Sequence, residues 1–302
     1  LGRRMKFFSI QANHRENNRK TYQALIITLV GNLVLAIGKM TAAYVSPSSA
    51  LRADAYNSLS DVLYSVMLVI GMIIALQPPD ISHPQGHRRF EPLVGLVISF
   101  SMAWAGFQAV SGSISKIRHG VEPFEFGMPV IVLVGSALIK LLMFWLIRRI
   151  AKDISSPTLK TASVDNLMDT ITSLTAIAGI LLSQIWTSLA DPIAGILVAI
   201  WIFRAAFNAL VENLGFLTGA GAPEERRQQF LDEIAAVPGV ANVHQLFTEY
   251  AGTKFVLDVH INVDGNTTLY EVHRIETEIE ERLTAIPDVE RAYIHVEPLG
   301  YD

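Results

Sequence analysis

Long apolar runs recur along the first two thirds of the chain. A helix that crosses a lipid bilayer needs about 20 mostly apolar residues, and several stretches of the 302-residue sequence meet this requirement. These stretches are residues 22–45, 50–76, 92–115, 126–150, 160–184 and 189–211. The pattern therefore predicts an α-helical membrane protein with six transmembrane helices. Together they occupy residues 22–211, after a short N-terminal tail over residues 1–21.

The spacing of apolar residues changes beyond residue 211. Pro223 followed by two glutamates is typical of a helix start, and residues 255–263 alternate between apolar and polar side chains, as in a half-buried strand. The predicted elements are a helix over 223–236, strands over 243–250 and 255–263, a helix over 268–283 and a strand over 291–297. Residues 212–302 are thus expected to form one small α+β domain with the order αββαβ.

Charge divides the chain into the same two parts. Residues 1–211 carry 18 Lys and Arg against 11 Asp and Glu, a net charge of +7, whereas residues 212–302 carry 6 against 17, a net charge of −11. Twelve basic residues fall on the side of the predicted bundle that holds both termini, and three on the opposite side. The positive-inside rule then predicts that both termini, with the acidic domain, lie in the cytoplasm.

Composition also excludes several kinds of chemistry. The acidic domain makes nucleic acid an unsuitable partner, because phosphate binding requires clustered Lys and Arg. The chain has no cysteine, which excludes disulfides and thiolate metal sites.

Two of the predicted membrane helices carry carboxylates. A charged group at the membrane centre costs about 3 kcal/mol or more, so its presence there indicates a functional site. Asp54, Asn57 and Asp61 share one face of the second predicted helix, and Asp165 and Asp169 lie one turn apart on the fifth. If the two faces meet, Asn57, Asp61, Asp165 and Asp169 surround one point with four oxygen-bearing side chains, as a divalent cation requires.

Helix capping or ion pairing with Lys39 or Lys140 is the alternative explanation for these carboxylates. Both lysines lie within predicted membrane helices, but two lysines cannot balance five acidic groups, among which we count Asp191. Asp54 and Asp191 lie near the starts of their helices, where an N-cap role would account for them. We therefore place both of them outside the site.

These features resemble the cation diffusion facilitator family of divalent-metal transporters over nearly the whole chain. Residues 53–61 (ADAYNSLSD) are similar to the family's second-span signature, and residues 83–87 (HPQGH) resemble its His-Pro-x-Gly-His loop. Asp-Pro at 191–192 opens the sixth span, as is common in the family. The resemblance implies a ferredoxin- or metallochaperone-like cytoplasmic domain and a homodimer joined through it. It also implies a transport site formed by Asn57, Asp61, Asp165 and Asp169.

The side chains of this implied site indicate which metal is transported. Zinc-transporting members usually carry a histidine there, whereas this chain has one amide and three carboxylates. Oxygen ligands favour harder ions such as Mn²⁺ over Zn²⁺, and the Asn-Asp-Asp-Asp set resembles the family's bacterial manganese branch. We therefore expect proton-coupled Mn²⁺ efflux by alternating access across a bacterial cytoplasmic membrane, with Fe²⁺ second and Zn²⁺ third as substrates.

The resemblance implies two further groups of metal ligands. One is the loop set Asp80, His83 and His87. The other is the cytoplasmic-domain set His244, His260, His273, His295 and Glu297, where a regulatory divalent metal would join two protomers. Strand alternation independently puts His295 and Glu297 on one strand face and His260 on the polar face of its strand. The alternative is that these are ordinary loop and surface histidines.

Two other classes of protein share some of these features. An intramembrane aspartyl protease also needs two aspartates on facing helices that share a proton, but the residues before Asp165 and Asp169 match neither the Tyr-Asp nor the Gly-x-Gly-Asp pattern of such enzymes. A membrane-anchored metal sensor would leave the carboxylates inside the spans unexplained. The sequence therefore favours a secondary transporter over an enzyme.

Overall fold

The computed structural model describes the chain except for residues 1, 46–48, 79, 84–85, 121–126, 186–188 and 301–302. Backbone alone is described at residues 2–16, 49–54, 57, 128–129, 176, 179–185 and 191. The chain divides into two compact units. The helical unit comprises Leu1–Gln77 and Leu93–Asn213, and the C-terminal unit comprises Pro78–Pro92 and Leu214–Asp302.

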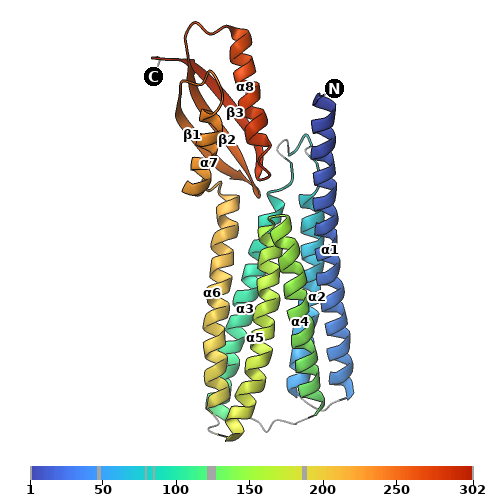
Figure 1. Cartoon of the computed structure of the whole chain (residues 1–302). Coiled ribbons are helices and arrows are strands. Elements are labelled where there is room, and N and C mark those ends of the chain that lie inside the picture. Colours follow the sequence, from blue (N-terminus) through green and yellow to red (C-terminus); the bar gives the residue numbers. More distant parts are fainter. Residues whose placement is uncertain are drawn as a thin grey trace. The chain divides into compact units, whose positions relative to one another are not determined.

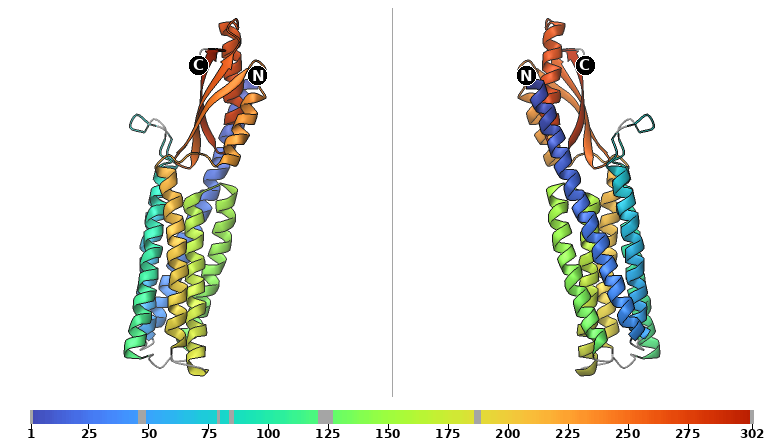
Figure 2. Two further views of the ribbon diagram at one scale, coloured as in Figure 1. Left: turned by 90° about the vertical axis from the view of Figure 1, so that its left-hand side faces the viewer. Right: turned by 90° about the vertical axis from the view of Figure 1, so that its right-hand side faces the viewer.

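Long helices lie side by side in the helical unit, with their axes roughly aligned (Figures 1 and 2). They are α1 (Gly2–Val45), α2 (Ser49–Ala75), α3 (Phe90–His119), α4 (Met128–Asp153), α5 (Pro157–Ile185) and α6 (Ala190–Leu217). Within the described residues, α1, α2, α3, α4 and α6 each contain a stretch long and apolar enough to cross a membrane. The remaining helix, α5, carries Lys160, Asp165 and Asp169. The predicted helical membrane bundle is therefore confirmed.

The first helix is longer than its apolar run. The hydrophobic pattern predicts a span from residue 22, whereas α1 begins at Gly2. Backbone hydrogen bonding continues a helix through polar sequence as readily as through apolar sequence, so the apolar run marks only the part suited to lipid.

The helical unit exposes large apolar side chains and buries several polar ones. Leu63, Phe100 and Trp145 are each more than half exposed, as expected of side chains that face lipid. The helices are closely packed inside the unit, and a Cβ at Gly31 of α1 would overlap the Met143 side chain of α4. A glycine at this position therefore allows α1 and α4 to approach closely.

The C-terminal unit has the predicted αββαβ order (Figure 1). Its elements are α7 (Glu224–Ala235), β1 (Asn242–Ala251), β2 (Lys254–Val263), α8 (Leu269–Thr284) and β3 (Val289–Pro298). The strands form a sheet in the order β1-β2-β3, in which β1 and β2 are antiparallel and β2 and β3 parallel. Thr268 caps α8, since its hydroxyl oxygen accepts a hydrogen bond from the Glu271 amide.

One face of the sheet forms the core of the C-terminal unit. Leu257, Val259 and Ile261 of β2 are fully buried and belong to one apolar cluster with Ile279 of α8 and Phe230 of α7. Since side chains alternate along a strand, His260 and its neighbours on β1 and β3 lie on the opposite face, away from α7 and α8. The sheet is thus apolar towards its helices and polar on its open face.

The loop before α3 packs on the β1–β2 hairpin of the same unit. Gly252, at the hairpin turn, has φ +75°, and a Cβ there would lie 2.7 Å from the carbonyl carbon of Arg88. The Arg88 side chain reaches Glu290, with Nε 3.5 Å from Oε2, and Lys254 contacts the same carboxylate oxygen at 3.3 Å. The hairpin and β3 therefore position the loop that carries His83 and His87.

Candidate metal centres

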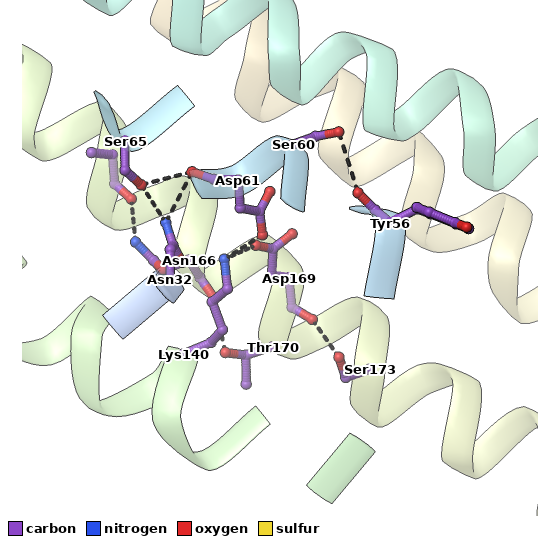
Figure 3. Close-up of polar contacts among 11 residues, drawn as sticks. Asn32, Tyr56, Ser60, Asp61, Ser65, Lys140, Asn166, Asp169, Thr170 and Ser173 are labelled. Atoms are coloured by element: carbon purple, nitrogen blue, oxygen red, sulfur yellow. Dashed lines mark hydrogen bonds and ion pairs between the residues drawn. The ribbon is translucent and has the colours of Figure 1, made fainter. Parts of the chain in front are cut away.

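A buried lysine joins carboxylates from two helices inside the helical unit (Figure 3). Lys140 of α4 donates a hydrogen bond of 2.9 Å to Asp61 Oδ2 of α2. Its Nζ also lies 2.7 Å from Asp169 Oδ2 of α5 in an ion pair. Lys140 is only 4% exposed, so these contacts provide the charge compensation that a buried ammonium requires.

Polar side chains of α1 and α2 hold the backbone at Asp61. Ser65 donates a 2.7 Å hydrogen bond to the Asp61 carbonyl oxygen, and the Asn32 amide nitrogen donates one of 2.7 Å to the Ser65 hydroxyl (Figure 3). Asn32 and Ser65 are both buried. Packing between α1 and α2 therefore fixes the position from which the Asp61 side chain extends.

Three of the four side chains of the predicted transport site are among the described residues. Asp165 lies one turn before Asp169 on α5 and interacts electrostatically with Asp61, Asp169 and Lys140. The side chain of Asn57 lies outside the described residues. So do the side chains of Asp54 and Asp191, which were assigned to helix starts. The described part of the site thus holds three carboxylates and one ammonium.

Buried amide oxygens near these carboxylates accept no hydrogen bond from the described residues. They belong to Asn32 and Asn166, which are each 2% exposed. The Asn166 amide nitrogen donates a 2.8 Å hydrogen bond to the Ala162 carbonyl within α5. Oxygen atoms of this kind suit hard cations and water better than thiophilic metals.

Asp80, His83 and His87 form a second group of metal ligands, here called the loop cluster. One potential ligand atom from each lies within 4.8 Å of the others. His87 is buried, and its Nδ1 lies 3.2 Å from the Pro78 carbonyl oxygen. In that hydrogen bond Nδ1 is the donor, and Nε2 lies 3.5 Å from Asp80 Oδ2. A histidine oriented in this way can bind a metal through Nε2.

The Asp80 carboxylate is held in its ionised form by the turn that follows it. The backbone amide of His83 donates a 2.6 Å hydrogen bond to Asp80 Oδ1. This bond is the main cause of a pKa for Asp80 below its ordinary value of 3.8, and the nearby imidazoles add to the effect. The loop cluster therefore offers a charged oxygen ligand at neutral pH.

His244, His260 and Glu297 form a third group, the sheet cluster, on the open face of the β-sheet. Their ligand atoms also lie within 4.8 Å of one another. His244 Nδ1 lies 3.0 Å from Asn262 Oδ1, and its Nε2 lies 3.3 Å from Glu297 Oε2. If Nδ1 donates to Asn262, the Nε2 lone pair faces a carboxylate oxygen. A proton or a metal cation between these two atoms would relieve their repulsion.

The structure brings one more of the predicted histidines to the sheet cluster and leaves another apart. The ring centroid of His295 is 4.8 Å from that of His260, and His295 Nε2 lies 3.1 Å from Glu297 Oε1. His273 lies on α8, which packs on the other face of the sheet, and its Nδ1 is 3.8 Å from Glu276 Oε2. Within one chain, His273 is thus outside the sheet cluster.

Comparison with known proteins accounts for both units. Residues 25–218 match the cation efflux transmembrane domain, and residues 222–299 match the cation efflux protein cytoplasmic domain. The chain belongs to the cation diffusion facilitator family. It is accordingly a divalent metal cation efflux transporter and not an enzyme.

Relatives of this transporter align over nearly its full length. An uncharacterized transporter, MJ0449 of Methanocaldococcus jannaschii, is 32% identical, with 92% of this chain and 99% of the relative covered. The manganese efflux system protein MneS of Bacillus subtilis is 27% identical, with 93% and 97% covered. Metal tolerance protein C1 of Arabidopsis thaliana is 27% identical, with 89% and 61% covered.

Some residues around the transporter's carboxylates were not singled out from its sequence. Asn32, Ser65 and Asn166 were overlooked, although each is a polar residue inside a predicted membrane helix, which is a recognisable signal. Lys140 was considered only as an alternative partner for the aspartates. Its contact with both Asp61 and Asp169 depends on which helices are neighbours, and spacing along one helix does not reveal that.

Proposed function

We propose that the transporter exports Mn²⁺ in exchange for protons, with Asn57, Asp61, Asp165 and Asp169 as its transport site. One observation carries this assignment. Asp61 and Asp169, from helices far apart in sequence, lie on either side of a single cationic group, at 2.9 and 2.7 Å. Carboxylates from two helices that share one cation are placed to share a divalent ion as well.

The ligand types support Mn²⁺ as the substrate. The proposed site contains amide and carboxylate oxygens without imidazole or thiolate, a set that suits Mn²⁺ and then Fe²⁺. A relative that aligns along almost the whole chain is a manganese efflux system protein. Zn²⁺ is the alternative substrate, since Zn²⁺ binds many oxygen sites more tightly than Mn²⁺ does.

Proton exchange follows from the charges of the proposed ligands. Asn57 is neutral in every state, so only the three aspartates can exchange a metal for protons. In an alternating-access cycle, metal binds from the cytoplasm and leaves on the far side as protons replace it on the carboxylates. With both termini in the cytoplasm of a bacterial cell, this direction is efflux across the cytoplasmic membrane.

Cytoplasmic metal would act on the transporter through the loop and sheet clusters. Imidazole and carboxylate ligands suit divalent transition metals, and the sheet cluster lies on a face that α7 and α8 leave open. We expect two copies of the chain to associate through this unit, with bound metal favouring the dimer.

Metal flux into proteoliposomes containing the purified protein tests the proposal. Under an imposed pH gradient we expect Mn²⁺ flux to exceed Fe²⁺ and Zn²⁺ flux, to depend on the gradient and to be lost in Asp165→Ala. Zn²⁺ flux without Mn²⁺ flux would overturn the choice of metal but not the site. Mn²⁺ flux that survives Asp165→Ala would overturn the site.

A further inference from the structure

We propose that Lys140 sets the net charge of the transport site, and thereby its preference for divalent over trivalent cations. The inference rests on the transport site proposed above. It assigns Lys140 a role in specificity that goes beyond linking helices.

The contacts of Lys140 put its charge within the site. Its ammonium group touches one carboxylate oxygen from α2 and one from α5, and the side chain is almost fully buried. Both contacts use the Oδ2 atoms of Asp61 and Asp169, and each carboxylate has a second oxygen with which to bind a metal. Lys140 and a bound cation can therefore share the same two aspartates.

Charge balance then determines which cation fits. Asp61, Asp165 and Asp169 together carry three negative charges when ionised, and Lys140 reduces this to a net −2. One divalent ion neutralises a net charge of −2, whereas a trivalent ion leaves an uncompensated positive charge in a medium of low dielectric constant. Without Lys140 the balance reverses, and a trivalent ion matches the three carboxylates.

The other charged groups near these aspartates have smaller effects. Lys39 of α1 acts on Asp61 more weakly than Lys140 does. Tyr64 of α2 is buried and interacts electrostatically with the same three aspartates, but its neutral phenol does not alter the charge balance. Lys140 is thus the cationic side chain whose removal should change the preference most.

Competitive binding of La³⁺ and Mn²⁺ to the purified full-length protein in detergent tests this role. The metal bound to an Asp61→Asn/Asp169→Asn variant is subtracted, since that variant retains the loop and sheet clusters. One unit charge at about 5–8 Å in an effective dielectric constant of about 20 corresponds to about a thirty- to three-hundredfold change in affinity ratio. We expect Lys140→Gln to raise the ratio of La³⁺ to Mn²⁺ affinity by that factor.

Matched variants separate charge from structure. Lys140→Arg keeps the charge and should keep the wild-type ratio, and Lys39→Gln should change the ratio less than Lys140→Gln. The double variant Lys140→Gln/Asp169→Asn removes one positive and one negative charge together and so restores the net −2 of the wild type. It should prefer Mn²⁺ again, and it provides a test even if Lys140→Gln alone does not fold.

The outcomes are distinct. An unchanged ratio in Lys140→Gln, or a double variant that retains the La³⁺ preference, would overturn the role of Lys140 while leaving the transport site intact. If both metals bind more tightly by the same factor, the ratio is also unchanged. That result would mean that Lys140 only competes with the metals, which contradicts the proposal. If the wild type binds no more metal than the Asp61→Asn/Asp169→Asn variant, the transport site itself is wrong.

Discussion

The two units of the transporter differ in where their polar and apolar side chains lie. In the helical unit, Lys140 is buried among carboxylates while Leu63 is 64% exposed. In the C-terminal unit, Leu257 is fully buried and the imidazoles of the sheet cluster lie on the open face. Apolar side chains are buried in the core where the surroundings are water, and they also face outward where the surroundings are lipid.

This difference between the units explains why the candidate metal centres use different ligands. A charge inside a membrane bundle is costly, so a site there needs groups of its own that offset its charges. Lys140 offsets part of the charge of Asp61 and Asp169, and a divalent cation would offset the rest. The sheet cluster is partly exposed, and water can supply the ligands and the screening that it lacks. The predictions below change one unit at a time and begin with the largest expected effect.

Removing one carboxylate from the bundle should have the largest effect. Asp169→Asn keeps the size of the side chain but removes a charged ligand, and we expect metal flux in proteoliposomes to fall by about a hundredfold or more, as loss of a charged ligand at a buried site implies. Asp153→Asn is the matched control, because Asp153 also lies in the helical unit but pairs with Lys20 and is 46% exposed at its side chain. Equal losses in both variants would contradict the assignment.

Truncating a leucine should have opposite consequences in the two units. Leu257→Ala opens a cavity in the core of the C-terminal unit and should lower its stability by about 2–5 kcal/mol. Leu63→Ala removes a lipid-facing side chain and should cost less than about 1 kcal/mol. Hydrogen exchange at the amides of β2 and α2, measured in the detergent-solubilised full chain, gives both values. A larger loss of protection around Leu63 would mean that α2 is packed against protein there.

The sequence predicted the elements of the C-terminal unit more closely than the start of α1. Strand alternation predicted residues 255–263, and β2 is Lys254–Val263, because burial on one face imposes a period of two. No comparable pattern marks the polar residues before Thr21, although α1 includes them. Hydrophobic patterning therefore locates segments that contact a core or lipid, and it does not locate the polar part of a helix.

The acidic residues of the candidate site could be predicted from the sequence, but the contact with Lys140 that offsets part of their charge could not. Asp61, Asp165 and Asp169 are conspicuous because carboxylates are costly within apolar runs. That Lys140 contacts two of them depends on the packing of α4 beside α5 and near α2, which no local pattern encodes. His273 illustrates the same limit, since its place on α8 separates it from the histidines of the sheet.

Metal binding at the sheet cluster should stabilise the C-terminal unit by a smaller amount. A ligand at 100 times its dissociation constant stabilises a protein by about 2.7 kcal/mol, and His260→Ala should remove most of the rise in β2 exchange protection caused by Mn²⁺ or Zn²⁺. His273→Ala is the matched control, because His273 is on the other side of the sheet from this cluster. If His273→Ala removes the effect as fully as His260→Ala does, the two histidines belong to one site in the dimer.

The pH dependence of the loop should be the smallest of these effects, because Asp80 is exposed. The folded loop lowers the pKa of Asp80 below its ordinary value of 3.8, mainly through the hydrogen bond from the His83 amide. The carboxylate therefore contributes stability above pH 3.8, and that contribution is lost as the pH falls through the folded pKa. With a metal chelator present, Asp80→Asn should speed amide exchange in the loop at pH 5–7, and the difference from the wild type should shrink below pH 3.8. A difference that grows as the medium becomes more acidic would mean that the protonated carboxyl, rather than the carboxylate, stabilises the turn.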